Sequence, residues 1–217
     1  MNKSKYELNE RISAILINPY LSIDEFNINC NLIKKYNIKN ISTTLNYISD
    51  VKKSLGNHKV KINTLISFPL GDLPSIVIDQ MIDYSIDQGA NGIEYLPKFF
   101  YLSKNEEEKF ANDIEIISKK KLPLTLIFNQ NRMREKVFIK AINIALELGI
   151  KFFQFGDGFG STLNGFDIQE IKKLLNDKSC IKVSGKVRNI ENAIELLDHG
   201  ADIISTSYFH DIFLDVN

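Results

Sequence analysis

The segment "DHGADIIST" (198–206) joins the polar end of a helix pattern to a run of β-favouring residues through Gly200. The same arrangement occurs at "DQGANGIEY" (87–95) and at "ELGIKFFQF" (147–155). Glycine readily adopts the left-handed backbone conformation that ends a helix, so each segment predicts a helix, a glycine stop and a strand. Helices that alternate with strands in this way are typical of a parallel sheet.

Short β-rich runs and amphipathic stretches alternate along the whole chain. The predicted strands are 12–17, 38–43, 59–66, 92–96, 123–128, 152–155, 181–184 and 203–206. The predicted helices include one that begins at Ser22, where Glu25 completes a capping box, and the stretches 75–88, 105–119, 132–148, 167–175 and 189–199.

Eight strand units in 217 residues predict a compact (β/α)8 TIM barrel, slightly shorter than the roughly 250 residues typical of that fold. We find no linker or change of composition and expect one domain over residues 1–217. A doubly wound open sheet is the alternative fold. In a barrel, the functional site lies where the strands end, at the C-terminal face.

The composition argues against several classes of partner. The chain has 27 Lys and Arg against 27 Asp and Glu, so it carries no basic surface for nucleic acid or an anionic membrane. The polar start lacks the apolar core of a signal peptide, and no apolar run approaches the roughly 20 residues of a membrane span. We therefore expect a cytoplasmic protein. Two distant cysteines, Cys30 and Cys180, are expected to be reduced packing residues.

Three polar side chains fall on the predicted interior of the barrel. In the sixth strand Phe153 and Phe155 share one face, which leaves Gln154 to point inward if the two rings meet the helices. By the same alternation Lys182 and Glu94 point inward from the seventh and fourth strands. Because an unpaired buried charge is costly, these residues predict either a functional site or a satisfied polar layer.

Glycines and basic residues follow the last three strands. Gly158, Gly185, Lys186, Arg188 and the serines 205 and 207 lie at the predicted turns, and the turn after Gly185 leads into a helix near residue 189. Backbone amides at such a turn, together with the two cations, favour a phosphate site. Ordinary turn chemistry with solvated cations is the alternative.

Five motifs of this chain resemble those of deoxyribose-phosphate aldolases. They are "ISFPLGD" (66–72), "GANGIEY" (89–95), "KFFQFGDGFG" (151–160), "IKVSGKVRN" (181–189) and "GADIISTS" (200–207), in the family's order. The similarity runs from about residue 12 to residue 207. Its most specific parts are the FPLG turn and the K-x-S-G-x-x-R segment that begins at Lys182.

The resemblance implies the chemistry of a class I aldolase. In that family a lysine on the sixth strand forms a Schiff base with the sugar carbonyl, and deoxyribose 5-phosphate is cleaved to glyceraldehyde 3-phosphate and acetaldehyde. A second lysine lowers the pKa of the nucleophile, and an aspartate takes part in proton transfer. The resemblance places the second lysine at Lys182 and the carboxylate at Glu94, while the position of the nucleophile holds Gln154.

Other departures agree with the loss of the Schiff-base lysine. The family's polar strand-one motif falls on Ser13, Ala14 and Ile15, a later lysine falls on Asn18, and the strand-five glutamate of many members falls on Phe128. The phosphate site is partly kept. Gly158, Gly185, Arg188 and Ser207 match the family, whereas Lys186 and Ser205 replace glycines.

We therefore expect an aldolase-like barrel without standard Schiff-base activity, which binds a phosphorylated sugar or a similar small metabolite. The first alternative is an active aldolase or related carbon–carbon lyase with Lys182 as a displaced nucleophile and Glu94 or Asp157 as proton carrier. A second is non-covalent enolisation with Glu94 as the base. We expect no cofactor and no metal, since the three histidines lack the spacing of metal ligands. The sequence leaves open whether the chain forms a homo-oligomer.

Overall fold

The computed structural model describes residues 7–159, 162–175 and 178–215. Eight strands of these residues form a barrel in chain order, and each pairs in parallel with the next. β8 pairs with β1, which closes the barrel. The strands are β1 (Ile12–Leu16), β2 (Asn40–Thr43), β3 (Lys61–Ile66), β4 (Gly92–Tyr95), β5 (Leu124–Phe128), β6 (Phe152–Phe155), β7 (Cys180–Ser184) and β8 (Ile203–Thr206). The predicted (β/α)8 barrel is confirmed, and the open sheet is wrong.

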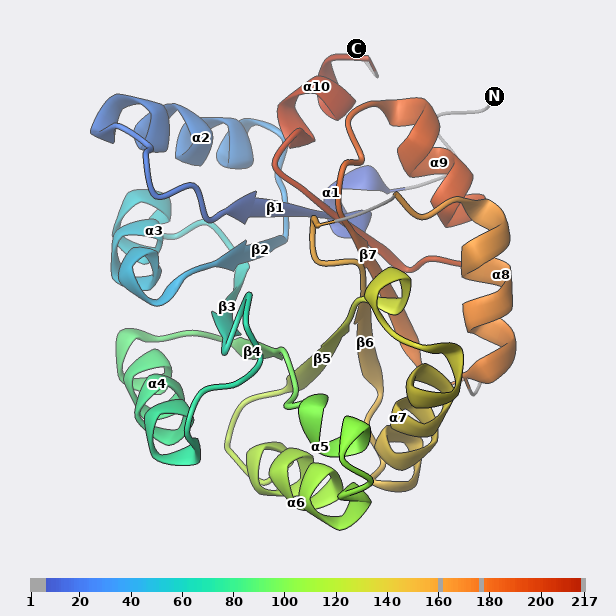
Figure 1. The fold of residues 1–217 in the computed structure, drawn as a ribbon. Helices are drawn as coiled ribbons and strands as arrows, with labels where there is room; N and C mark the ends of the chain where they lie inside the picture. The colour runs from blue at the N-terminus through green and yellow to red at the C-terminus, as the bar shows by residue number, and fades with distance from the viewer. Residues whose placement is uncertain (1–6, 160–161, 176–177, 216–217) are drawn as a thin grey trace.

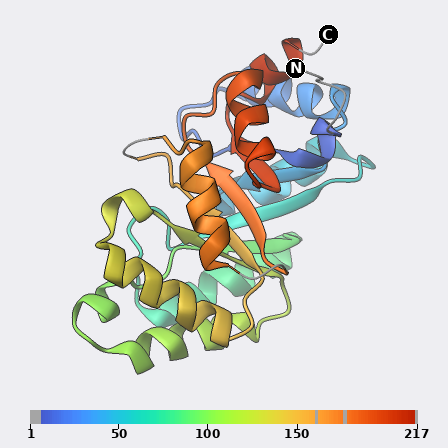
Figure 2. The same cartoon turned by 90° about the vertical axis from the view of Figure 1, so that its right-hand side faces the viewer.

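Helices form an outer ring around the strands (Figure 1). In the side view α8 and α9 lie over the outer face of the barrel (Figure 2). The helices are α1 (Leu8–Arg11), α2 (Ile23–Lys35), α3 (Ile48–Leu55), α4 (Ser75–Gln88), α5 (Phe100–Ser103), α6 (Glu107–Ser118), α7 (Glu135–Glu147), α8 (Gly165–Leu174), α9 (Ile190–Asp198) and α10 (Phe209–Leu214), with 3-10 helices η2 (Leu45–Tyr47) and η3 (Gln130–Arg132). None of the helices in the described residues is both long and apolar enough to span a bilayer.

The local signals in the sequence act as predicted. The Ser22 hydroxyl accepts a hydrogen bond from the Glu25 amide, and the Glu25 carboxylate accepts one from the Ser22 amide, so the capping box at the start of α2 is complete. Gly89, Gly149 and Gly200 have φ values of 89°, 75° and 114°. These left-handed conformations end α4, α7 and α9 just before the next strand.

An aromatic layer joins β5 and β6 to the helices. Phe153 and Phe155 are fully buried, and the Phe155 ring packs edge-on against Phe138 of α7, with 6.1 Å between the ring centroids. Phe128 lies in the same layer, 5.8 Å from Phe155. The two rings of β6 therefore meet the helices, as predicted, and Gln154 is turned to the interior. Phe152, at the start of the strand, is 43% exposed.

Candidate functional site

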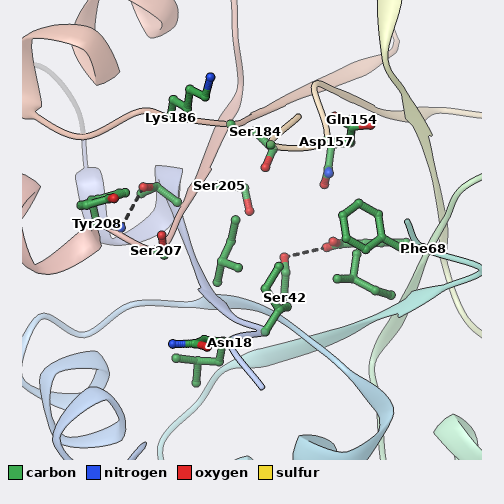
Figure 3. Close-up of a pocket in the computed structure, with 18 of the residues that line it drawn as sticks. Asn18, Ser42, Phe68, Gln154, Asp157, Ser184, Lys186, Ser205, Ser207 and Tyr208 are labelled. Carbon is green, nitrogen blue, oxygen red and sulfur yellow. Dashed lines mark hydrogen bonds between the residues drawn. The ribbon is translucent and has the colours of Figure 1, made fainter. Parts of the chain in front are cut away.

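A cavity of about 550 Å³ opens at the C-terminal ends of the strands. Most of the predicted site residues line it, namely Glu94, Gln154, Gly158, Gly185, Lys186, Arg188, Ser205 and Ser207. Figure 3 shows the side chains of Ser42, Ser184 and Ser205 around its centre. We call it the mouth cavity. Its position agrees with the general placement of sites in this fold.

A buried ion pair lies at the base of the mouth cavity. The Lys182 Nζ atom is 2.5 Å from Glu94 Oε1, and the two side chains are 7% and 1% exposed. Lys182 also donates a hydrogen bond to Ser42 Oγ at 2.7 Å, and Ser42 donates to Glu94 Oε1 at 2.9 Å. The structure thus brings together the lysine and carboxylate that strand alternation turned inward, and it adds a serine that sequence reasoning missed.

Lys182 also borders a cavity at the other end of the barrel. This second cavity, of about 390 Å³, lies at the N-terminal ends of the strands, and Lys182 is not among the described residues that line the mouth cavity. Glu94 lines both cavities. The carboxylate and Ser42 therefore lie between the amine of Lys182 and a ligand that enters at the mouth.

Gln154 points toward the centre of the mouth cavity (Figure 3). In the strand register, Gln154 of β6 is paired with Lys182 of β7. The side-chain Nε2 donates a weak hydrogen bond of 3.4 Å to the carbonyl of Gly156. The Oε1 atom is buried and has no hydrogen-bond partner among the described residues.

The glycine turns after β6 and β7 touch each other at the rim of the mouth cavity. A Cβ atom on Gly185 would lie 3.2 Å from the Gly158 nitrogen, and one on Gly156 would lie only 2.0 Å from the Ser184 carbonyl oxygen. Gly158 and Gly185 also have left-handed φ values, 85° and 107°. Glycine turns of this kind can present backbone N–H groups to a concave surface, which is a common way to hold an anion.

The turn after β8 joins the same rim. The Thr206 hydroxyl donates to the carbonyl of Val187 at 2.6 Å and accepts from the Tyr208 amide at 2.9 Å. The guanidinium carbon of Arg188 lies 5.2 Å from the centroid of the Tyr208 ring. These contacts tie the turn after β8 to the turn after β7 and hold Arg188 against Tyr208 at the edge of the cavity.

Lys186 is placed differently from Arg188. Its side chain is exposed and runs away from the ring of serines in Figure 3. Its backbone has φ 58°, the left-handed conformation that glycine adopts most easily. The resemblance places a glycine of the aldolase motifs at this position, which agrees with the left-handed backbone of Lys186.

Asp157 is a further buried carboxylate at this rim, 7% exposed, which the sequence offered only as a proton carrier for the alternative mechanism. Its Oδ1 accepts hydrogen bonds from Asn129 Nδ2 at 2.5 Å and from the Phe159 amide at 2.9 Å. Arg132 lies 3.8 Å from the other oxygen. Asp157 therefore fixes the turn after β6 to the turn after β5.

The remaining departures from the aldolase motifs occupy distinct places. Ser13 lies inside the barrel, with its Oγ atom 3.2 Å from Ser42 Oγ, and Ile15 lines the mouth cavity. Asn18 also lines that cavity. Phe128 lies outside the barrel in the aromatic layer, so no carboxylate occupies that position near the cavity. Within the described residues no group of three His, Cys, Asp or Glu side chains could hold a metal ion.

Known proteins resemble this chain in sequence and in fold. No protein-family model matches the chain. The curated deoxyribose-phosphate aldolase of Mycoplasmopsis pulmonis is 28% identical over 204 residues, which cover 93% of each protein. The predicted resemblance to deoxyribose-phosphate aldolases is therefore confirmed along nearly the whole chain.

Solved structures show the same fold. An aldolase described as QR15 superposes with a TM-score of 0.89 at 21% identity, over 96% of this chain and 95% of that one. The tetrameric deoxyribose phosphate aldolase from Aeropyrum pernix gives a TM-score of 0.80 at 19% identity, over 97% of this chain and 90% of that one.

Proposed function

We propose that this chain is a divergent deoxyribose-phosphate aldolase relative that binds a phosphorylated sugar or a similar small metabolite in the mouth cavity and has lost the Schiff-base reaction. One observation carries the proposal. An amide, Gln154, lines the cavity at the position to which the sequence resemblance assigns the nucleophile, and the neighbouring Lys182 is held in a buried ion pair with Glu94.

The chemistry of imine formation explains why this arrangement favours a binding function. A class I aldolase needs a neutral amine, because a protonated amine has no lone pair with which to attack a carbonyl. The Lys182 ammonium donates to Glu94 and to Ser42, and Lys182 is not among the described residues that line the mouth cavity. An amide such as Gln154 cannot form an iminium ion.

The rim of the cavity supplies groups for a phosphate. In the described part of the chain, the backbone N–H groups of Gly158, Gly185 and Ser207 have no hydrogen-bond partner. Arg188, held against Tyr208, adds a positive charge at the same rim. Converging amides with one guanidinium are a common anion site, and a sugar attached to that phosphate would extend over the serines toward the floor.

The alternative is an active aldolase or related lyase with Lys182 as the nucleophile, and one observation favours it. Glu94 Oε1 lies 2.5 Å from the amine, so a proton passed to the carboxylate would leave a neutral lysine inside the barrel. A carbonyl substrate would then have to pass Ser42 and Glu94 to reach it.

Thermal-shift and calorimetric titrations with deoxyribose 5-phosphate and with deoxyribose test the proposal. We expect only the phosphate to bind, and we expect Arg188→Ala to weaken it by tenfold or more. Arg134→Ala, at an exposed arginine outside the cavity lining, is the matched control and should bind like wild type. The proposal fails if no phosphorylated sugar binds, or if a coupled aldehyde assay shows turnover that Lys182→Ala abolishes.

A further inference from the structure

We infer that the ligand presents hydroxyl groups, as hydrogen-bond donors, to the floor of the mouth cavity, which is formed by Glu94, Gln154 and Ser205. The ligand class is then a phosphorylated polyol, or a sugar phosphate in its cyclic hemiacetal form, and an open-chain aldehyde is disfavoured. This inference rests on the proposed binding of a phosphorylated metabolite and adds the chemistry of the end opposite the phosphate.

The orientation of the Gln154 amide is the first observation. The carbonyl of Gly156 accepts hydrogen bonds only, so the atom of the amide that faces it must be the NH₂ group. The Oε1 atom is consequently the one left without a partner, in a side chain that is only 4% exposed and points to the cavity centre (Figure 3). Gln154 thus offers the ligand an acceptor.

Glu94 supplies a second acceptor by a different route. Its Oε1 accepts hydrogen bonds from both the Lys182 ammonium and the Ser42 hydroxyl. Its Oε2 receives nothing from the described residues, although the residue is 1% exposed and lines the mouth cavity. Buried acceptors without a donor are costly, and a ligand that supplies the donors removes that cost.

The donors near the floor are already engaged with this carboxylate. Lys182 and Ser42 both donate to Glu94 Oε1, and Lys182 lies outside the mouth cavity lining. The Ser205 hydroxyl is buried and unpartnered, and a hydroxyl can donate or accept. The centre of the cavity therefore has two unpartnered acceptors, Gln154 Oε1 and Glu94 Oε2, beside the hydroxyls of Ser184 and Ser205, which can donate or accept.

These acceptors and hydroxyls favour some functional groups of a sugar phosphate over others at the floor of the cavity. A hydroxyl of a polyol or a hemiacetal donates to Glu94 or Gln154 and accepts from Ser205. A carbonyl or carboxylate oxygen only accepts, so it could take a hydrogen bond from Ser205 but would leave Gln154 Oε1 and Glu94 Oε2 without a donor. The aldolase reaction requires a free carbonyl at this end of the sugar. Gln154, which stands in place of the nucleophile, and Glu94 therefore also disfavour the open-chain substrate of that reaction.

Calorimetric titration with three phosphates of one carbon skeleton tests the inference. The probes are 2-deoxyribitol 5-phosphate, its 1-O-methyl ether and 2-deoxyribonate 5-phosphate. The ether keeps the charge of the alditol and lacks the terminal donor, and the aldonate replaces the terminal hydroxyl with a carboxylate. We expect the alditol to bind at least tenfold tighter than either of the others.

A substitution at the floor provides an independent readout. Gln154→Met keeps the volume and removes the acceptor, so it should weaken the alditol about tenfold and change the affinity for the ether by less than threefold. The wild-type comparison stands without this variant if the variant fails to fold. Equal binding of all three phosphates, or tighter binding of the aldonate, overturns the inference and leaves the proposed function intact. If none of the three phosphates binds, the inference is overturned, and the proposed function is overturned with it only if deoxyribose 5-phosphate also fails to bind.

Discussion

Replacing Glu94 with glutamine removes the charge that faces the Lys182 ammonium and keeps the size of the side chain. The two side chains are 1% and 7% exposed, so the ammonium cannot recover hydration from solvent. Removal of one partner of a buried ion pair typically costs about 3–5 kcal/mol. For a chain of this size, 1 kcal/mol corresponds to about 2–4 °C, so we expect Glu94→Gln to lower the melting temperature by about 6–20 °C.

The double variant Glu94→Gln/Lys182→Met separates charge from packing. It removes both charges, so it should regain most of the lost free energy of unfolding and lie within about 1–2 kcal/mol of wild type. The control Lys119→Met breaks an exposed ion pair with Glu115 and should change the free energy of unfolding by less than about 1 kcal/mol. Melts followed by circular dichroism give all four values. If the single variant melts within about 2 °C of wild type, or if the double variant is no more stable than Glu94→Gln, the buried pair is not charged as we describe it.

Three further predictions concern the turns and a cysteine. Gly156→Ala should destabilise the protein by about 2–5 kcal/mol because its Cβ would lie 2.0 Å from the Ser184 oxygen, whereas Gly158→Ala, with open space, should cost only about 1–2 kcal/mol in a melt; equal costs would contradict this. Because Lys186 has a left-handed backbone, with φ 58°, we expect Lys186→Gly to be about 0.5–1 kcal/mol more stable than Lys186→Ala in urea unfolding. The reverse order would contradict the strain argument. Burial raises the pKa of the Cys180 thiol from 9.0 to about 11, so its alkylation at pH 8 should be about 100-fold slower than in the unfolded chain and should accelerate with pH up to about 11; equal rates, measured by mass spectrometry, would refute it.

The barrel could be predicted because its signals are local. The glycine stops and the two-residue alternation of each strand do not depend on distant residues, and all eight predicted strands are present within one or two residues of their expected ends. The sequence reading omitted α3, although Ile48, Val51 and Leu55 occupy one face of it and are buried. The helix has only eight residues, and such short amphipathic stretches give a weak periodic signal.

The site could be predicted in part, for a similar reason. Alternation correctly turned Lys182, Glu94 and Gln154 inward, because the face of a strand residue follows from its position in the strand. Alternation does not give the depth of a side chain along the barrel axis, which depends on the tilt and stagger of the strands. That depth places Lys182 on the N-terminal cavity. Ser42 was missed because its partners lie on β4 and β7, far away in the sequence.

Borohydride trapping tests the central claim most directly. The protein is incubated with deoxyribose 5-phosphate and sodium borohydride, digested and mapped by mass spectrometry, with the Mycoplasmopsis pulmonis aldolase treated in parallel as a positive control. Because Gln154 cannot form an imine and Lys182 is held by Glu94, we predict no reduced adduct on any lysine of this chain under conditions that label the control. A reduced adduct on the peptide that contains Lys182 would contradict the account.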